Sequence, residues 1–168
     1  ACAETGTSVT MRGAGTSIAG NALGAGVVVA TRSLARIVEL DPAAGYAVVE
    51  PGVVLDDLNA AATPHGLRVG PDPSTDSRCT LGGMIGNNAC GSHSVVWGTT
   101  AQNILGLDVI RSDGTRVRLT SPDAPARPAD PAWPELDGPL AYELRAFTAD
   151  HDELLRRELP SWPRRVSG

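Results

Sequence analysis

Lysine is absent from this chain of 168 residues, in which all 14 basic residues are arginine. The net charge is −5, and the arginines are scattered until two pairs at 156–157 and 164–165. Nucleic-acid binding usually needs a basic stripe, which this distribution does not supply. A Walker A phosphate loop is excluded too, because that motif requires a lysine. We interpret the two arginine pairs as part of a solvated helix face and tail.

Cysteine and aromatic residues are also scarce. The 3 cysteines form no CxxC pair, which argues against a disulfide scaffold or a metal site and favours a reduced, cytoplasmic setting. Aromatic residues make up 4% of the chain, so we expect a core of Val, Leu, Ile and Ala. No apolar run approaches the roughly 18 residues of a membrane helix, and no signal peptide opens the chain. We therefore expect a cytoplasmic protein, and peripheral association with the inner membrane stays open.

Glycine and proline are plentiful, with 19 and 13 residues, and they indicate many turns and shaped loops. Strand-like runs, interpreted as a meander, occupy residues 7–12, 27–32, 36–41 and 46–51. Helical periodicity marks residues 54–63, 80–89 and 140–155. A hairpin around Asp113-Gly114 is predicted over residues 104–120, followed by a proline-rich surface excursion over 121–139. This mixture predicts an α+β chain, with a first α/β part at 1–75 and a second at 76–168.

The loop RGAGTSIAG at residues 12–20 is the first of two glycine-rich segments. It is not a Rossmann fingerprint, because Ile18 stands where the third glycine is required and the chain runs on into a strand. Its glycines still allow positive φ angles and converging N–H groups that can bind an anion. Thr16 and Ser17 add hydroxyl donors, and Arg12 is the available cation. On the loop alone, a turn without a ligand is the favoured interpretation.

The second segment, RCTLGGMIGNNACGSHS at residues 78–94, carries no charge after Arg78. Its three closely spaced glycines at 82, 83 and 86 suit a free-standing helix poorly, but they suit close approach of another backbone or a flat ligand. A helix with Thr80 as its N-cap would offer free N–H groups and a positive dipole end. Two such segments in an acidic chain without lysine predict a diphosphate held mainly by backbone amides.

Five stretches carry a resemblance to a known family. They are, in order, RGAGTSIAG (12–20), PGVVLDDLN (51–59), PHGL (64–67), GPDPS (70–74) and RCTLGGMIGNNACGSHS (78–94). Together they resemble the FAD-binding domain of the D-lactate dehydrogenase and glycolate oxidase flavoprotein family, which has the vanillyl-alcohol-oxidase (PCMH) type of flavin fold. The hairpin at 110–119 fits the same pattern. The tail PRRVSG (163–168) more weakly resembles large members fused to an iron–sulfur module.

The resemblance implies a two-subdomain, PCMH-type FAD-binding fold of the α+β class, of which this chain is an incomplete fragment. It implies an FAD-dependent oxidoreductase that oxidises the CH–OH group of a small 2-hydroxy acid, such as D-lactate or glycolate, by hydride transfer to FAD. The substrate-cap domain, the catalytic residues and an iron–sulfur electron acceptor would lie outside this chain, so the fragment alone is expected to be inactive. Oxidation of another alcohol and a non-catalytic nucleotide- or partner-binding module are the alternatives.

By the same resemblance, the FAD pyrophosphate would lie on the first loop and the rest of the cofactor along the second segment. The residues expected to bind FAD are Arg12, Gly13, Ala14, Gly15, Thr16, Ser17, Gly20, Pro71, Asp72, Ser74, Thr80, Gly82, Gly83, Gly86, Asn87, Asn88, Gly91, Ser92, His93 and Ser94. We expect non-covalent FAD, because Thr16 stands where some relatives have a flavin-linked histidine. Cys79 is one residue away from the position of the cysteine that others use.

Several side chains in this region also have a plainer interpretation. Cys79 and Cys90 are interpreted as small packing residues rather than redox groups. Trp97 is interpreted as a core residue rather than a stacking platform. His93 is interpreted first as a hydrogen-bonded loop histidine, although it remains the side chain best suited to lie near the flavin.

Overall fold

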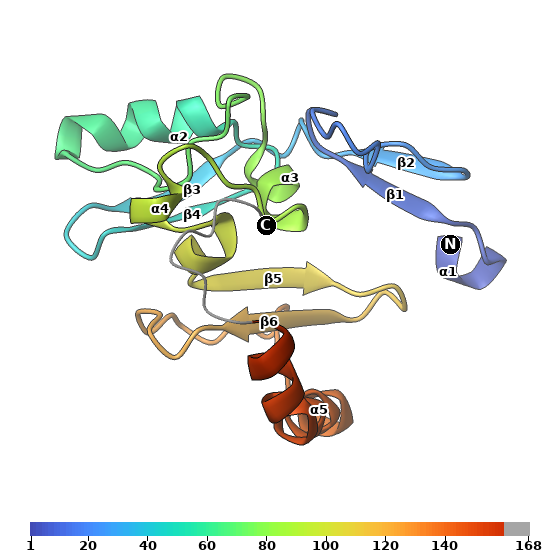
Figure 1. Cartoon of the computed structure of the whole chain (residues 1–168). Coiled ribbons are helices and arrows are strands. Elements are labelled where there is room, and N and C mark those ends of the chain that lie inside the picture. Colours follow the sequence, from blue (N-terminus) through green and yellow to red (C-terminus); the bar gives the residue numbers. More distant parts are fainter. Residues whose placement is uncertain (160–168) are drawn as a thin grey trace. The chain divides into compact units, whose positions relative to one another are not determined.

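The computed structural model describes residues 1–159, so the predictions for the tail at 160–168 lie outside the described residues (Figure 1). The described chain forms two compact units, residues 1–103 and 104–159. The predicted division at 75/76 falls inside the first unit. There Val54 forms a β-bridge with Thr80, and the Leu55 N–H donates to the Cys79 carbonyl at 3.1 Å. Packing therefore divides the chain at a different point from the predicted boundary.

The first unit contains two separate two-stranded sheets, formed by β1 (Val9–Arg12) with β2 (Val27–Ala30) and β3 (Ile37–Asp41) with β4 (Tyr46–Val49). The first pair is parallel and the second antiparallel. The predicted meander is therefore wrong for the first pair. Residues 13–26 provide a connection of the length that parallel strands require. Before β1, the short helix α1 (Cys2–Thr5) ends at Gly6, whose φ of 64° is left-handed.

The core of the first unit lies between β3–β4 and the helices that follow. Helix α2 (Leu55–Ala62) buries the residues that its periodicity predicts, and it ends in the 3-10 turn η1 (Thr63–His65). Helix α3 (Leu81–Gly86) follows the next loop. The buried cluster consists of Val53, Leu55, Leu58, Cys79, Leu81 and Met84. It contains no aromatic residue, which confirms the expected aliphatic core and the packing role of Cys79.

Two further short elements complete the first unit, α4 (Ser94–Trp97) and the 3-10 helix η2 (Thr100–Asn103). The peptide N–H of Thr100 donates to the Ala89 carbonyl at 2.9 Å, and the Thr100 hydroxyl donates to the same oxygen at 2.6 Å. Thr100 is only 3% exposed. These two hydrogen bonds connect the second glycine-rich segment, at Ala89, to the start of η2.

The second unit begins with the predicted hairpin, β5 (Gly106–Ile110) and β6 (Arg116–Thr120), which turns at Gly114 with a φ of 85°. The proline-rich excursion returns along β6. The Arg118 N–H donates to the Pro134 carbonyl at 2.7 Å, and the Leu136 N–H donates to the Arg118 carbonyl at 2.8 Å. The excursion is thus partly tied to the sheet edge rather than wholly free.

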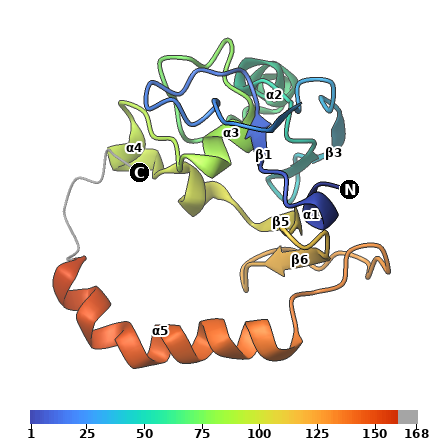
Figure 2. The ribbon, with the colours of Figure 1, turned by 90° about the vertical axis from the view of Figure 1, so that its right-hand side faces the viewer.

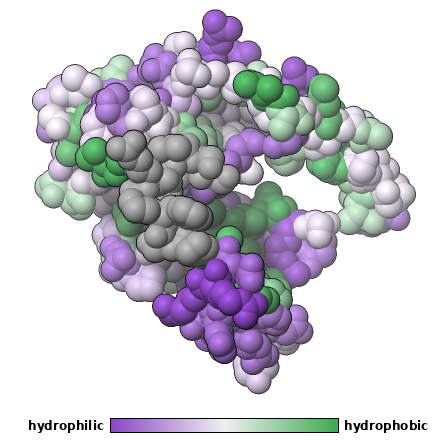
Figure 3. Space-filling view, in the orientation of Figure 1, coloured by the Kyte–Doolittle hydropathy of each residue, from purple (hydrophilic) through white to green (hydrophobic). Residues whose placement is uncertain are grey.

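Helix α5 (Gly138–Glu158) is a long helix of 21 residues, drawn in orange to red in Figure 2. Ala141 is the only buried residue among those described in it. The part of the helix turned toward the viewer in Figure 3 is hydrophilic. None of the helices in residues 1–159 combines the length and the apolar character that crossing a membrane requires.

Candidate cofactor-binding site

The two glycine-rich segments meet at Gly13 and Thr80. A Cβ atom on Gly13 would lie 2.1 Å from the Thr80 hydroxyl oxygen, so only glycine fits this approach. Thr80 is 1% exposed and occupies the N-cap position of α3, but its hydroxyl makes no capping bond. Among the described residues, the Thr80 hydroxyl oxygen is the buried side-chain polar atom that has no hydrogen-bond partner. Such an orphan group is costly unless a ligand satisfies it.

An amide pair joins the same two segments. The Asn21 Nδ2 atom donates to Asn87 Oδ1 at 2.5 Å, and Asn87 Nδ2 donates to the Gly83 carbonyl at 3.0 Å. Asn87 therefore positions backbone rather than offering a free amide. Asn21 was not predicted, because it lies just beyond the loop and its partner is 66 residues away. No local pattern signals such a pairing.

The outer part of the first loop has the properties of an anion-binding turn. Gly15 has a φ of +75°, and a Cβ there would lie 3.1 Å from a guanidinium nitrogen of Arg12. Arg12 is exposed and forms no ion pair with the described residues. Thr16 is exposed and Ser17 half-buried. The loop thus offers a cation, hydroxyl groups and bare backbone at one place.

A second cluster joins the loop around Asp72 to residues 91–93. One Asp72 oxygen accepts the His93 peptide N–H at 3.0 Å, and the other accepts the Ser92 hydroxyl at 3.2 Å and the His93 Nδ1 atom. Burial alone would raise the pKa of Asp72, but the hydrogen bonds from His93 and Ser92 lower it below its ordinary value. Pro71, next to Asp72, is fully buried. Asp72 is therefore an ionised residue whose acceptors are already used.

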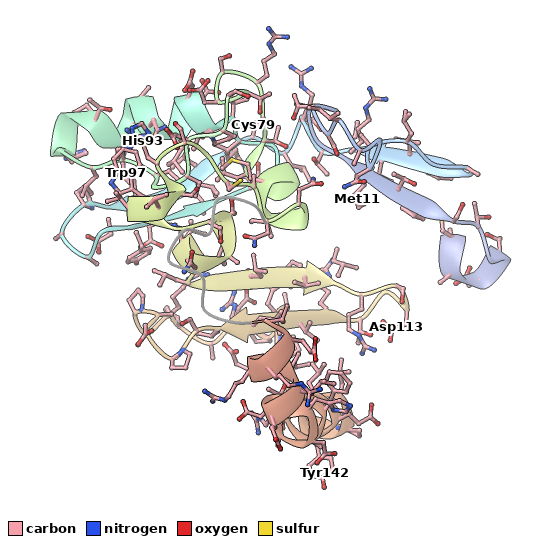
Figure 4. All side chains as sticks on the ribbon, viewed as in Figure 1. Met11, Cys79, His93, Trp97, Asp113 and Tyr142 are labelled. Atoms are coloured by element: carbon pink, nitrogen blue, oxygen red, sulfur yellow. The ribbon has the colours of Figure 1, made fainter. Side chains whose placement is uncertain are left out.

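His93 and Trp97 lie side by side in this cluster (Figure 4). Their ring centroids are 4.7 Å apart with an angle of 30° between the planes, and the Arg68 guanidinium lies 4.1 Å from the Trp97 centroid. Trp97 is half-buried and outside the core cluster. The expectation that Trp97 is a core residue is therefore wrong, since the ring is used for stacking.

The remaining predicted residues divide into two kinds. Some shape the loops: Asn88 has a φ of 43° and accepts the Ala101 N–H at 2.8 Å, and the buried Ser94 hydroxyl accepts the Gly91 N–H at 2.9 Å. A Cβ on Gly82 would lie 2.7 Å from the Pro51 side chain. By contrast, Gly20 and Gly86 face open space. Ala14 lies within the first loop, and Ser74 is exposed after the Asp72 loop.

The structure thus gathers the predicted residues into two clusters, one at Gly13 and Thr80 and the other at Asp72 and His93. Helix α3 and the residues that follow it form the covalent connection between them. Within residues 1–159, no group of three or more His, Cys, Asp or Glu side chains could hold a metal ion. An orphaned hydroxyl, a glycine-lined contact and an exposed arginine together fit a phosphate-bearing ligand.

Comparison with known proteins identifies the family. A family profile described as "FAD binding domain" matches residues 1–120. This chain belongs to that FAD-binding domain family. The match covers the predicted stretches from residue 12 to residue 94 and the hairpin formed by β5 and β6.

Relatives of this FAD-binding domain include a dehydrogenase and a subunit of an oxidase. The chain is 35% identical over 161 residues to D-2-hydroxyglutarate dehydrogenase of Pantoea ananatis, covering 95% of this chain and 16% of the relative. It is 36% identical over 115 residues to glycolate oxidase subunit GlcD of Escherichia coli, covering 67% of this chain and 23% of the relative. The chain therefore spans only a small part of the length of these proteins.

The fold is also found among solved structures. The crystal structure of 6-hydroxy-D-nicotine oxidase from Arthrobacter nicotinovorans matches with a TM-score of 0.61 and 24% identity, over 70% of this chain and 25% of that one. At this identity the match concerns the fold alone. It confirms the predicted α+β, PCMH-type FAD-binding architecture.

Proposed function

We propose that this FAD-binding domain holds FAD non-covalently, with the diphosphate on the first loop and at the Gly13–Thr80 contact. The observation that carries the proposal is the buried Thr80 hydroxyl, which lacks a partner where two glycine-rich segments converge. A phosphate oxygen that reached this hydroxyl would satisfy it. Arg12 and the hydroxyls of Thr16 and Ser17 would add charge-assisted and neutral hydrogen bonds from the outer side of the loop.

The residues at and next to the positions of a flavin link in some relatives support non-covalent binding. Cys79, the thiol nearest to the position of a flavin link in some relatives, is 5% exposed and belongs to the core cluster. Burial raises the pKa of the Cys79 thiol, and a thiol with a raised pKa is a poor nucleophile. Thr16 offers only an unactivated hydroxyl. Neither residue is suited to form a bond with the flavin.

We further infer that a longer protein containing this chain oxidises the CH–OH group of a 2-hydroxy acid. The activities that the relatives' names give, D-2-hydroxyglutarate dehydrogenase and glycolate oxidase, support this substrate class. FAD would supply the hydride acceptor, and the residues of this chain would bind and orient it. The catalytic base, the substrate-cap domain, an iron–sulfur electron acceptor and the cytoplasmic or peripheral membrane location remain predictions. The chain alone is expected to be inactive.

The binding proposal is tested by calorimetric titration of the purified chain with FAD, and by the flavin absorbance that remains after gel filtration. Gly13→Ala should abolish or strongly weaken binding, because its new Cβ would displace Thr80. Gly45→Ala, in the turn between β3 and β4 and outside both glycine-rich segments, is the control. Its φ of +72° makes the substitution strained, but FAD binding should stay normal. Absence of both heat and retained flavin in the unmodified chain would contradict the proposal.

The substrate proposal needs a protein of the relatives' full length that contains this chain. Addition of D-2-hydroxyglutarate, D-lactate or glycolate without an electron acceptor should bleach the visible absorbance of the flavin. If no 2-hydroxy acid bleaches it while another alcohol does, the substrate class is wrong and the FAD-binding proposal stands.

A further inference from the structure

The Asp72–His93 pair suggests a role that goes beyond binding by loop backbone. Asp72 comes before the second glycine-rich segment, yet its two oxygens accept three hydrogen bonds, all from Ser92 and His93. Its side chain is 17% exposed. These bonds occupy most of the acceptor sites of the carboxylate, and its charge would repel the diphosphate. Asp72 was predicted to contact the cofactor directly. Its contacts favour an indirect role instead, in which Asp72 acts through His93.

The backbone around the pair is built to keep this contact. A Cβ atom on Gly91 would lie 2.2 Å from Asp72 Oδ1, so the two loops approach as closely as glycine allows. The Ser94 hydroxyl, which is buried, accepts the Gly91 N–H at 2.9 Å and closes the turn from its other side. The Trp97 ring lies against the His93 ring, with a tilt of 30° between the planes. The imidazole is thus held by a hydrogen bond, by a ring contact and by its own backbone.

These contacts leave one ring nitrogen of His93, Nε2, accessible to a ligand. Because Asp72 is an ionised acceptor, Nδ1 of His93 carries the proton and donates to it. Among the described residues, Nε2 has no hydrogen-bond partner, and the His93 side chain is 58% exposed. In neutral His93, the accessible nitrogen is therefore an acceptor. Carboxylates commonly orient histidines in this way when the other nitrogen has a task.

We propose that Asp72 is a positioning residue that fixes His93 as the Nδ1–H tautomer, and that Nε2 accepts a hydrogen bond from a donor group of bound FAD. The proposal rests on the proposed FAD-binding function. Phosphate oxygens are acceptors and cannot pair with this nitrogen. The matching groups on FAD are the hydroxyls of the ribityl chain and of the ribose, the adenine amino group and the N–H of the flavin ring. His93 would thus face the hydroxyl-bearing or ring portion of the cofactor, whereas Thr80 and Arg12 would face the diphosphate.

The direct test is long-range ¹H–¹⁵N NMR of the labelled chain, which distinguishes the two neutral tautomers and the protonated ring. The chain has only 3 histidines, so the spectrum is simple to assign. Neutral His93 should be in the Nδ1–H form and should leave it in Asp72→Asn. Added FAD should shift His93 Nε2. His65, an exposed residue in a 3-10 turn, and His151, which is hydrogen-bonded to Phe147 on α5, should not respond.

Two substitutions of His93 separate an acceptor role from a structural one. His93→Gln can place an amide oxygen where Nε2 lies, and His93→Asn can keep a donor to Asp72 but offers no acceptor there. The acceptor role predicts that Asn weakens FAD binding by about threefold to tenfold, the range of one hydrogen bond, and that Gln weakens it less. A purely structural role predicts the reverse order. Asp72→Asn should weaken binding to a similar extent, and adding it to His93→Asn should cost little more.

Three results would overturn the proposal. If FAD binds with measurable heat while His93 Nε2 does not shift, or if His93→Asn is the milder substitution, the acceptor role is wrong and FAD binding stands. If the unmodified chain gives neither heat nor retained flavin, the proposed function and this inference fail together. Circular dichroism and urea unfolding of each variant show whether a loss of binding comes from loss of the fold.

Discussion

Helices α2 and α5 are both amphipathic, but they differ in what covers them. In α2 the residues of the apolar face are buried, with Leu55 0% and Leu58 6% exposed. In α5 the corresponding residues remain open to solvent, with Leu144 50% and Phe147 58% exposed. Periodicity therefore predicts that a helix forms, but burial depends on a second element that supplies the opposing surface. Only the first of these helices contributes to a core in the described residues.

The same contrast separates two parts of the first unit. The segment from Val53 to Met84 supplies the buried cluster. The β1–β2 pair has apolar residues on both faces, and Val27, Val28 and Val29 are between 39% and 42% exposed. Hydrophobic residues are visible on the surface around β1 and β2 in Figure 3. Parallel strands are usually covered on both faces, so this pair, like α5, contributes little burial. We expect the buried cluster to dominate stability.

The largest effect should come from removing the centre of the buried cluster. Leu55→Ala should lower the free energy of unfolding by about 2–5 kcal/mol, because it leaves a cavity where the side chain has no exposed surface. Leu144→Ala on α5 is the matched control and should change it by less than about 0.5 kcal/mol. Urea unfolding followed by circular dichroism measures both. Equal losses for the two variants would refute the contrast between the helices.

A smaller effect is expected where the site loops touch. Gly91→Ala should cost about 1–3 kcal/mol, because the added Cβ would lie 2.2 Å from Asp72 and must push the loops apart. Gly86→Ala has nothing within 4 Å of the new Cβ and should be neutral or slightly stabilising. Urea midpoints of the two variants are compared. If Gly91→Ala is as stable as Gly86→Ala, the close approach of the two loops is wrong.

The Asp72 contacts should make part of the stability depend on pH. The folded-state pKa of Asp72 is lowered, so its contribution is complete above the unfolded value of about 3.9 and is lost as the pH falls through the folded value. Asp72→Asn should therefore cost about 1 kcal/mol at pH 7. The stability difference between the two proteins should shrink as the pH falls below the unfolded value. A difference that stays unchanged at acidic pH would show that the Asp72 charge does not stabilise the fold through this pair.

The smallest effect should come from the Trp97 stack at the surface. Arg68→Ala removes a guanidinium that lies 4.1 Å from the ring centroid, and should cost about 0.5–1 kcal/mol, as expected for an exposed cation–π contact. Arg127→Ala, at an exposed arginine in the proline-rich excursion, is the control and should have no effect. Tryptophan fluorescence and urea unfolding of the two variants test the contact. If Arg68→Ala changes neither the fluorescence nor the free energy of unfolding, Arg68 is only a solvated side chain.

Much of the architecture follows from local sequence. The Asp113-Gly114 turn is confirmed because the geometry of a two-strand hairpin is set by residues adjacent in the chain. The ends of η1 and α1 follow from glycines in left-handed conformations at Gly66 and Gly6. The aliphatic character of the core and the two glycine-rich loops could likewise be predicted, since both depend only on residue type.

The tertiary structure decided the features that join distant residues. The parallel pairing of β1 and β2, the Asn21–Asn87 bond across 66 residues and the Asp72–His93 bond across 21 residues have no local signal. Each depends on how the loops close over the core. By itself the sequence determined which segments form helices, strands and glycine loops, because backbone preferences are local. Only the fold decided which faces are buried and which nitrogen of His93 stays free, because both require a partner from elsewhere in the chain.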